Sequence, residues 1–260
     1  MEIPVGDASL AIPYASGSQR TRVVTEAWIK NYGFCLACES DRLRPTSPNT
    51  QARDFECDRC GHPYELKSSS TPFTKRVIDG AYASMIRRIQ TSTVPSFLLM
   101  QYTATWNLAN LFAIHHVFIT PEAIEQRKPL AETARRAGWV GCNILLSGIP
   151  PEGRIPLILE GVWVPRQECR SRFATVERLA VLTPSIRGWT ATVLGLLHRK
   201  GKQRFTIADA YELESELKRI YPANMNVRPK IRQQLQVLRD AGLLIFESRG
   251  TYRLAQISAD

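Results

Sequence analysis

The sequence has no apolar run that approaches the roughly 18 residues needed to cross a membrane. The first twenty residues also lack the basic start followed by an apolar stretch that is typical of an export signal. These absences exclude a helical membrane protein and favour a cytoplasmic location. In that compartment thiols stay reduced, so we expect the 6 cysteines to bind metal or remain free rather than form disulfides.

Acidic residues are also in deficit. The 260-residue chain has 34 Lys and Arg against 24 Asp and Glu, a net charge of +10 and a pI near 9.6. From Arg187 onward there are 13 basic and 7 acidic residues, a net of +6, which leaves 34 − 13 = 21 against 24 − 7 = 17, or +4, for the longer first part. The denser basic region at the C-terminal end suggests an acidic polymer as partner.

Four cysteines form two C-x-x-C pairs, Cys35 with Cys38 and Cys57 with Cys60, and 18 residues separate the pairs. This spacing is typical of a structural zinc site of the ribbon or knuckle type. The polar segment 41–53 between the pairs should be an exposed loop, tied down at both ends by the metal. Cys142 and Cys169 have no partner at metal spacing and should be ordinary thiols.

Asp54, Glu65 and Lys67 have the spacing D-x10-E-x-K of a nuclease metal site and overlap the second cysteine pair. Short alternating segments on both sides of that pair predict two strands, so Glu65 and Lys67 would share a face and an antiparallel partner could bring Asp54 beside them. The two carboxylates and the backbone carbonyl of Leu66 could then bind Mg²⁺, with Lys67 positioning the attacking water. The alternative is a solvated hairpin, because these residue types are common at surfaces.

The rest of the first part predicts a mixed sheet packed by helices. Helices are expected from Ser18 to Gly33 and over 73–88, and strands over the apolar runs 96–100, 107–120 and 155–164. His115 and His116 lie inside one such run, which makes them core or edge histidines rather than ligands.

The segment 126–144 combines basic residues with an aromatic. Arg135 and Arg136 can bind phosphate, and Trp139, between two glycine-containing turns, can be presented to bases. The alternative is a basic surface helix that ends at Gly138, with Trp139 packed into the core.

A domain boundary is expected at residues 183/184, giving domains 1–183 and 184–260. Three amphipathic helices and a hairpin after the boundary follow the winged-helix plan, in which the third helix enters the major groove. On that helix one outward stripe holds Arg228, Arg232, Gln236 and Arg239. A winged helix that binds protein is the alternative, because a fold does not dictate its partner.

These motifs together resemble the DpnI-type, methyl-directed restriction endonucleases over nearly the whole chain. The likeness begins at TEAW (25–28) and is most specific at DFECDRC, ELKS, DGAYASM (79–85), QRKPLA, TARRAGWVGCNI, RGWT (187–190) and IRQQLQVLRD (231–240). The resemblance implies an α+β chain, with a PD-(D/E)XK nuclease domain that carries the zinc site and a C-terminal winged helix. It also implies cleavage of duplex GATC sites carrying N6-methyladenine.

Carried over by position, Asp54, Glu65 and Lys67 match the catalytic residues, and Cys35, Cys38, Cys57 and Cys60 match the zinc ligands. The proline of the motif name is absent, since Arg53 precedes Asp54. The expected cofactors are Mg²⁺ for catalysis and Zn²⁺ for structure, the expected partner is adenine-methylated duplex DNA, and no obligatory protein partner is evident. The competing hypothesis is a zinc-ribbon and winged-helix regulator that binds DNA without cutting it.

Overall fold

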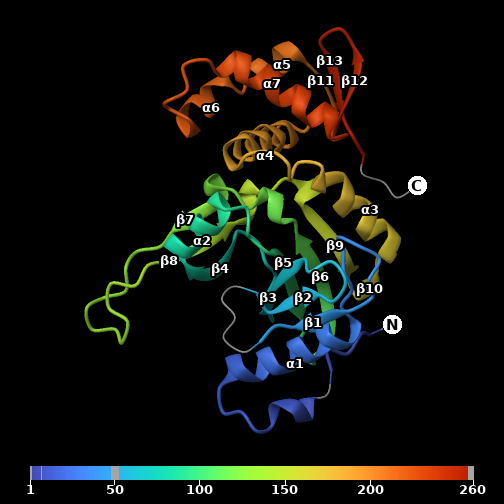
Figure 1. The fold of residues 1–260 in the computed structure, drawn as a ribbon, viewed down its shortest axis with the longest axis vertical. Coiled ribbons are helices and arrows are strands. Elements are labelled where there is room, and N and C mark those ends of the chain that lie inside the picture. Colours follow the sequence, from blue (N-terminus) through green and yellow to red (C-terminus); the bar gives the residue numbers. More distant parts are fainter. Residues whose placement is uncertain (1, 7, 48–52, 257–260) are drawn as a thin grey trace.

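A mixed sheet in the order β1-β2-β3-β5-β6-β9-β10 forms the centre of the first part of the chain (Figure 1). The computed structural model describes residues 2–6, 8–47 and 53–256. In chain order the strands are β1 (Leu43–Pro45), β2 (Phe55–Cys57), β3 (Pro63–Ser69), β5 (Ser96–Tyr102), β6 (Leu108–Ile114), β9 (Arg154–Leu159) and β10 (Val162–Trp163).

The central pair of this sheet, β3 and β5, is parallel, whereas the other neighbours are antiparallel. A parallel pair needs a crossover connection, and here β4 (Arg76–Ala81) and α2 (Tyr82–Gln90) lie in it. Strand β5 is buried over its first five residues, which agrees with its apolar sequence. The sheet therefore holds β3 firmly between β2 and β5.

Helix α1 (Gly17–Tyr32) packs against the sheet through Val24, Trp28 and Ile29, which recur at the spacing predicted from the sequence. It ends at Gly33, where a Cβ atom would lie 2.5 Å from the carbonyl oxygen of Ile29. Only glycine fits this close approach, so the chain turns there toward the first cysteines. Helix α3 (Arg166–Glu177) packs on β9 (Figure 1).

A second, small sheet has the order β4-β8-β7, with β7 (Ile124–Gln126) and β8 (Gly141–Leu145). The helix predicted over 73–88 is therefore wrong in its first half. Val77 and Asp79 are buried in alternation, which is the pattern of a strand. The partner of β4 is β8, more than 60 residues further along the chain, so no local pattern in 73–88 could reveal the pairing.

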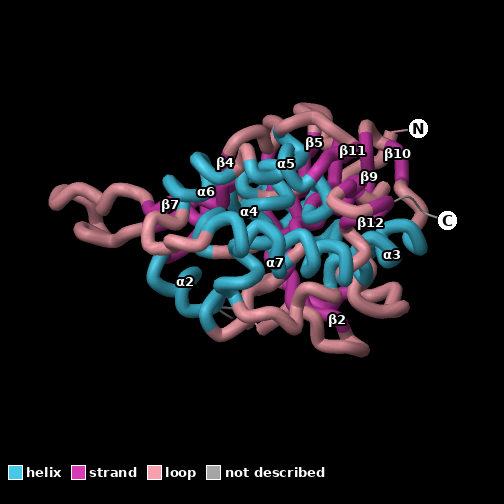
Figure 2. The backbone as a smooth tube through the Cα atoms, turned by 90° about the horizontal axis from the view of Figure 1, so that it is seen from above, coloured by secondary structure: helices cyan, strands magenta, loops and turns pink. Residues whose placement is uncertain are grey.

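The segment 41–53 is not wholly a loop, because Leu43–Pro45 forms β1 and pairs with β2; residues 48–52 lie outside the described part. Residues 127–140 form neither helix nor strand, so the alternative of a surface helix there is wrong. They make a long excursion between β7 and β8 that projects from the body (Figures 1 and 2).

The C-terminal part has the predicted three helical segments followed by a hairpin. Its elements are α4 (Pro184–Arg199), β11 (Arg204–Thr206), α5 (Ile207–Tyr211), α6 (Glu214–Ile220), α7 (Val227–Asp240), β12 (Leu244–Ser248) and β13 (Thr251–Leu254). The second predicted helix is broken into α5 and α6, and α5 begins with a capping box between Thr206 and Asp209. The strands form a sheet in the order β11-β13-β12.

Two clusters of buried apolar side chains form the core. One lies around Trp28, Phe55 and Tyr64, between α1 and the sheet. The other runs without interruption from Phe97 in β5 to Leu235 in α7. Helix α4 lies between the central sheet and α7 (Figure 1) and supplies the buried side chains that join them. The mixed α+β fold is thus confirmed, and in the described residues no helix is long and apolar enough to cross a bilayer.

Candidate active site

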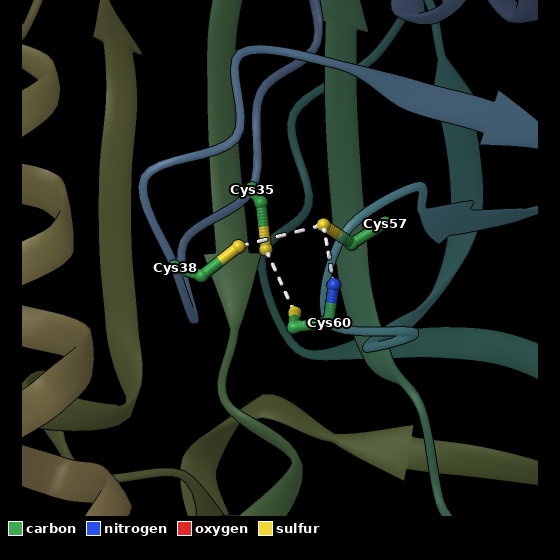
Figure 3. A group of neighbouring side chains, drawn as sticks. All are labelled: Cys35, Cys38, Cys57 and Cys60. Carbon is green, nitrogen blue, oxygen red and sulfur yellow. Dashed lines mark hydrogen bonds between the residues drawn. The ribbon is translucent and has the colours of Figure 1, made fainter.

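Four cysteine side chains converge from two loops (Figure 3). Cys35 and Cys38 lie between α1 and β1, Cys57 ends β2, and Cys60 lies in the turn before β3. The Sγ atoms are 3.6 Å apart for Cys35 and Cys60 and 3.5 Å apart for Cys38 and Cys57, and all four lie within 4.8 Å of one another. Tetrahedral zinc with Zn–S bonds of about 2.3 Å places sulfurs roughly 3.8 Å apart. The cluster, called the knuckle below, therefore fits a structural metal ion.

One thiol of the knuckle is prepared for metal by hydrogen bonds to its sulfur, whereas burial raises the pKa of Cys35 and raises that of Cys60 to about 11. Burial would raise the pKa of Cys57, but the backbone N–H groups of Cys60 and Arg59 and the side chain of Cys38 outweigh it and lower the pKa to about 7. The N–H groups lie 3.4 Å from the Cys57 sulfur. A thiolate is the form that binds metal, so one ligand is poised near neutral pH.

Tyr64 connects the knuckle to β3. Its hydroxyl group accepts a hydrogen bond of 2.9 Å from the backbone N–H of Leu36 and lies 3.4 Å from the sulfur of Cys35. The side chain is fully buried, and the next residue in β3 is Glu65. The position of the knuckle therefore helps to fix the position of Glu65.

The antiparallel pairing of β2 and β3 places Asp54 beside Leu66. The backbone N–H of Asp54 donates to the backbone carbonyl of Tyr64 at 2.9 Å. Oδ2 of Asp54 accepts a hydrogen bond from the backbone N–H of Leu66 at 2.8 Å. Glu65 and Lys67 project together from the face of β3 opposite to that of the Leu66 side chain, as the alternation predicts.

Lys67 lies between two acidic side chains. Its Nζ donates to Oε1 of Glu65 at 2.7 Å and to Oδ1 of Asp79 at 2.6 Å. A guanidinium nitrogen of Arg88 lies 3.9 Å from the other oxygen of Glu65. Sequence reasoning missed Asp79 because the wrong helix prediction covered it, and no local pattern in its own segment marks it as a neighbour of Lys67.

Burial sets the charge balance of this group. It raises the pKa of Glu65 to about 7, although Lys67 acts in the opposite direction. Burial would also lower the pKa of Lys67 and raise that of Asp79, but the attraction between the two groups prevails. The pKa of Lys67 is consequently raised and that of Asp79 lowered, so this pair stays ionised while Glu65 titrates near neutral pH.

Two acidic oxygens here fit a divalent cation. Oε2 of Glu65 and Oδ2 of Asp79 are buried and accept no hydrogen bond from another side chain in the described residues when both carboxylates are ionised. Protonated Glu65 can hydrogen-bond to Asp79, and this contact adds to the effect of burial in raising the pKa of Glu65. Such buried oxygens are costly to leave unsatisfied, and carboxylate and carbonyl oxygens are the ligands that Mg²⁺ prefers. In the described part of the chain the carboxylates of Asp54, Glu65 and Asp79 do not form one compact group of ligand atoms, because Asp54 is held by Leu66.

A cleft of about 570 Å³ opens beside β3. It is lined by α1, by residues 66–69 of β3 and by the segment 71–78, and Lys67 lies in its wall. Its basic residues are Arg22, Lys67, Lys75 and Arg76. Their charge suits a phosphate backbone.

Arg135, Arg136 and Trp139 lie in the excursion between β7 and β8, away from β3 (Figure 1). Both arginines are exposed. Trp139 is half-buried; its ring lies against Gly141, where an added Cβ would come within 2.8 Å, and the guanidinium of Arg136 stacks on it at 4.5 Å. The indole is therefore neither in the core nor free, but held between the excursion and β8.

The predicted stripe on α7 is exposed. Arg228, Arg232, Gln236 and Arg239 all face solvent, whereas Ile231, Leu235 and Leu238 are fully buried. Three of the four already have partners. Arg228 pairs with Glu214 at 2.6 Å, Arg232 bonds to the hydroxyl of Tyr211, and Arg239 pairs with Asp240 at 2.8 Å. Exposed pairs of this kind are weak and can be exchanged for phosphates.

Comparison with known protein families identifies the chain. Residues 1–181 match the DpnI family, described as the Dam-replacing family, and residues 185–254 match the Dam-replacing HTH domain. The chain belongs to the DpnI family. Membership agrees with the mixed sheet, the four-cysteine cluster and the C-terminal helix-turn-helix unit described above. For a DpnI family member, a restriction-type nuclease that acts on DNA, the buried group around Lys67 is the candidate catalytic centre.

Proposed function

We propose that this DpnI family member is a type II restriction endonuclease that requires Mg²⁺ and hydrolyses duplex DNA at GATC sites carrying N6-methyladenine. The observation that carries the proposal is the buried group of Glu65, Lys67 and Asp79 beside a basic cleft. Burying three charged side chains is costly, and a protein that only binds DNA has no use for it. The regulator hypothesis therefore has less support.

The chemistry is in-line attack of water on a phosphodiester. Asp54, Glu65 and the backbone carbonyl of Leu66 would hold Mg²⁺ once Asp54 gives up its hydrogen bond to the N–H of Leu66. The bound ion would stabilise charge on the phosphate and lower the pKa of water. Lys67 directs the attacking water and offsets negative charge in the transition state. Asp79 holds the ammonium of Lys67 through a 2.6 Å bond while Glu65 is engaged elsewhere.

We assign catalysis to residues 1–183 and a winged-helix DNA-binding domain to residues 184–260. Arg228, Arg232, Gln236 and Arg239 would face the major groove. Arg135 and Arg136 would contact phosphates while Trp139 contacts the methylated base. N6-methylation adds an apolar group in the major groove, and close contact of that group with an apolar surface such as the indole can strengthen binding of the methylated site. The knuckle would hold Zn²⁺.

A plasmid assay tests the proposal. The protein is incubated with Mg²⁺ and the same plasmid prepared with and without adenine methylation. We expect fragmentation of the methylated plasmid alone, at GATC sites. Retarded mobility without cutting would support the regulator hypothesis, and equal cutting of both plasmids would contradict methyl dependence.

A further inference from the structure

Three possible metal ligands meet outside the catalytic group and the knuckle. His115 follows β6, His116 begins the short helix η2 (His116–Phe118), and Glu177 is the last residue of α3. Oε2 of Glu177 lies 3.2 Å from Nε2 of His115 and 3.7 Å from Nε2 of His116. One ligand atom from each residue lies within 4.8 Å of the other two.

Neither a salt bridge nor a hydrogen bond explains this cluster. Burial lowers the pKa of His115 well below its usual value and that of His116 to about 3, so both rings are neutral at physiological pH. Against this effect of burial, the backbone of Phe173 lies close enough to the His115 ring to raise its pKa slightly. Nε2 of His115 and Oε2 of Glu177 are 3.2 Å apart, yet among the described residues neither makes a well-aligned hydrogen bond. The ring nitrogen therefore does not point its proton at the oxygen.

The unsatisfied atoms are deeply placed. The side chain of His115 is fully buried, and its ring packs on Phe173 with 3.9 Å between centroids. A buried polar atom without a partner is costly, and sites of this kind call for an explanation. A cation bound to both atoms would satisfy them together.

We propose that His115, His116 and Glu177 bind a second transition metal ion, of the class of Zn²⁺, distinct from the knuckle and from the catalytic centre. Zinc bonds to nitrogen and oxygen of about 2.0–2.1 Å place tetrahedral ligands roughly 3.4 Å apart. The distances of 3.2 and 3.7 Å lie on either side of that value. Two imidazoles and one carboxylate leave a fourth position open for water.

One hydrogen bond opposes the metal. Nδ1 of His115 accepts from the backbone N–H of Val117 at 3.3 Å, which in the metal-free chain places the ring proton on Nε2. Metal binding at Nε2 moves that proton to Nδ1 and gives up this long bond. We therefore expect this site to bind metal more weakly than the four thiolates of the knuckle.

The location suggests what the metal does. Glu177 ends α3, the last helix before the segment that leads to α4, and η2 packs directly on α4. A bound ion would clamp the end of α3 to the end of β6 at the surface on which α4 rests. The metal would thus help to fix the position of α4, and with it the C-terminal part, against η2.

Cobalt uptake by the full chain tests the proposal. Protein loaded with zinc in the knuckle, and kept in saturating Mg²⁺ to occupy oxygen sites, is equilibrated with Co²⁺. We expect one cobalt per chain, with visible d–d absorption and without a sulfur-to-cobalt charge-transfer band. Glu177→Gln and His116→Ala should each weaken uptake at least tenfold, whereas the matched controls Glu168→Gln, on the same helix, and His198→Ala should leave it unchanged.

Each other outcome counts against the site. Absence of uptake by the unaltered chain would overturn it, and so would uptake that persists in both variants. A charge-transfer band would show that cobalt has replaced zinc in the knuckle instead. Retained knuckle zinc, measured on the same samples by mass spectrometry, reports that the variants are folded; loss of both metals in both variants would also contradict the proposal.

Discussion

Glu65 is held in an environment that disfavours its charge. Its pKa of about 7 in the folded chain is above the ordinary value of 4.5, mainly because the carboxyl group is buried. A raised carboxyl pKa means that folding favours the protonated form of Glu65. Protonated Glu65 therefore stabilises the folded chain fully below pH 4.5, and this contribution is lost as the pH rises through 7. Above that pH the ionised side chain destabilises the metal-free protein.

Glu65→Gln should therefore stabilise the protein while it removes activity. The amide has a similar shape and no charge, so we expect the free energy of unfolding at pH 8 to rise by about 1–3 kcal/mol. The gain should vanish at pH 4. Urea unfolding in Mg²⁺-free buffer measures both values, and a plasmid assay should show cleavage lost with DNA binding retained.

Glu56→Gln is the matched control, because Glu56 lies in the neighbouring strand and pairs with exposed Arg44. It should change stability little at either pH. Lower stability of Glu65→Gln at pH 8, or loss of DNA binding together with cleavage, would indicate a structural role for Glu65.

Trp139 carries the prediction about methyl selectivity. Replacing it by alanine removes the indole from between Arg136 and Gly141 and leaves the catalytic group untouched. We expect the preference for methylated over unmethylated GATC to fall about tenfold, because one apolar contact usually changes substrate discrimination by about that factor. Relative cleavage rates on the two substrates measure it. An unchanged ratio in Trp139→Ala would mean that the methyl group is sensed elsewhere; Trp163→Ala is a suitable control at a distant exposed tryptophan.

At the scale of single elements, the hairpin of β2 and β3 depends on the knuckle. Cys57 and Cys60 lie inside it, and Tyr64 links it to Cys35. Chelation should consequently act in two stages. Weakly held Mg²⁺ leaves first and reversibly, with the fold intact, and zinc leaves later from four thiolates with loss of folded structure.

Circular dichroism and cleavage, followed together during prolonged incubation with a chelator, separate the stages. Added Mg²⁺ should restore cleavage after the first stage and fail to do so after the second. If zinc loss, measured by mass spectrometry, left both fold and activity intact, the hairpin would not depend on the knuckle.

The sequence predicted elements well where their determinants are local. The two C-x-x-C pairs, the helix that ends at Gly33, and the buried face of α7 all follow from short spacings. The sequence did not predict β4, because the partner strand of β4 is remote in sequence. The contact of Asp79, which lies in β4, with Lys67 was missed for the same reason. A catalytic neighbour supplied by a long-range strand pairing has no signature in its own segment, whereas D-x10-E-x-K lies within one hairpin and could be recognised.

At the scale of the whole molecule, the two family-matched segments share one core. Leu194 and Leu197 of α4 are buried in the cluster that reaches from β5 to α7. We expect Leu194→Ala to lower the free energy of unfolding by about 2–5 kcal/mol. Because the core is continuous, the transition should remain single and should shift as a whole.

Unfolding followed by tryptophan fluorescence and by circular dichroism tests this prediction. The two midpoints should coincide in the unaltered chain and in the variant. Val181→Ala, at a side chain that is 89% exposed, is the control and should change neither midpoint. Two separate transitions would show that the C-terminal part folds independently of the sheet.

The position of the knuckle along the chain has a consequence for biosynthesis. All four of its cysteines lie within the first 60 residues, whereas β6 must wait for β9, at residues 154–159, before the sheet is complete. During translation, zinc can therefore close the knuckle long before the ribosome has delivered the rest of the sheet. The nascent chain would then carry a preformed hairpin on which β5 docks. Zinc starvation would therefore first impair the folding of newly synthesised chains.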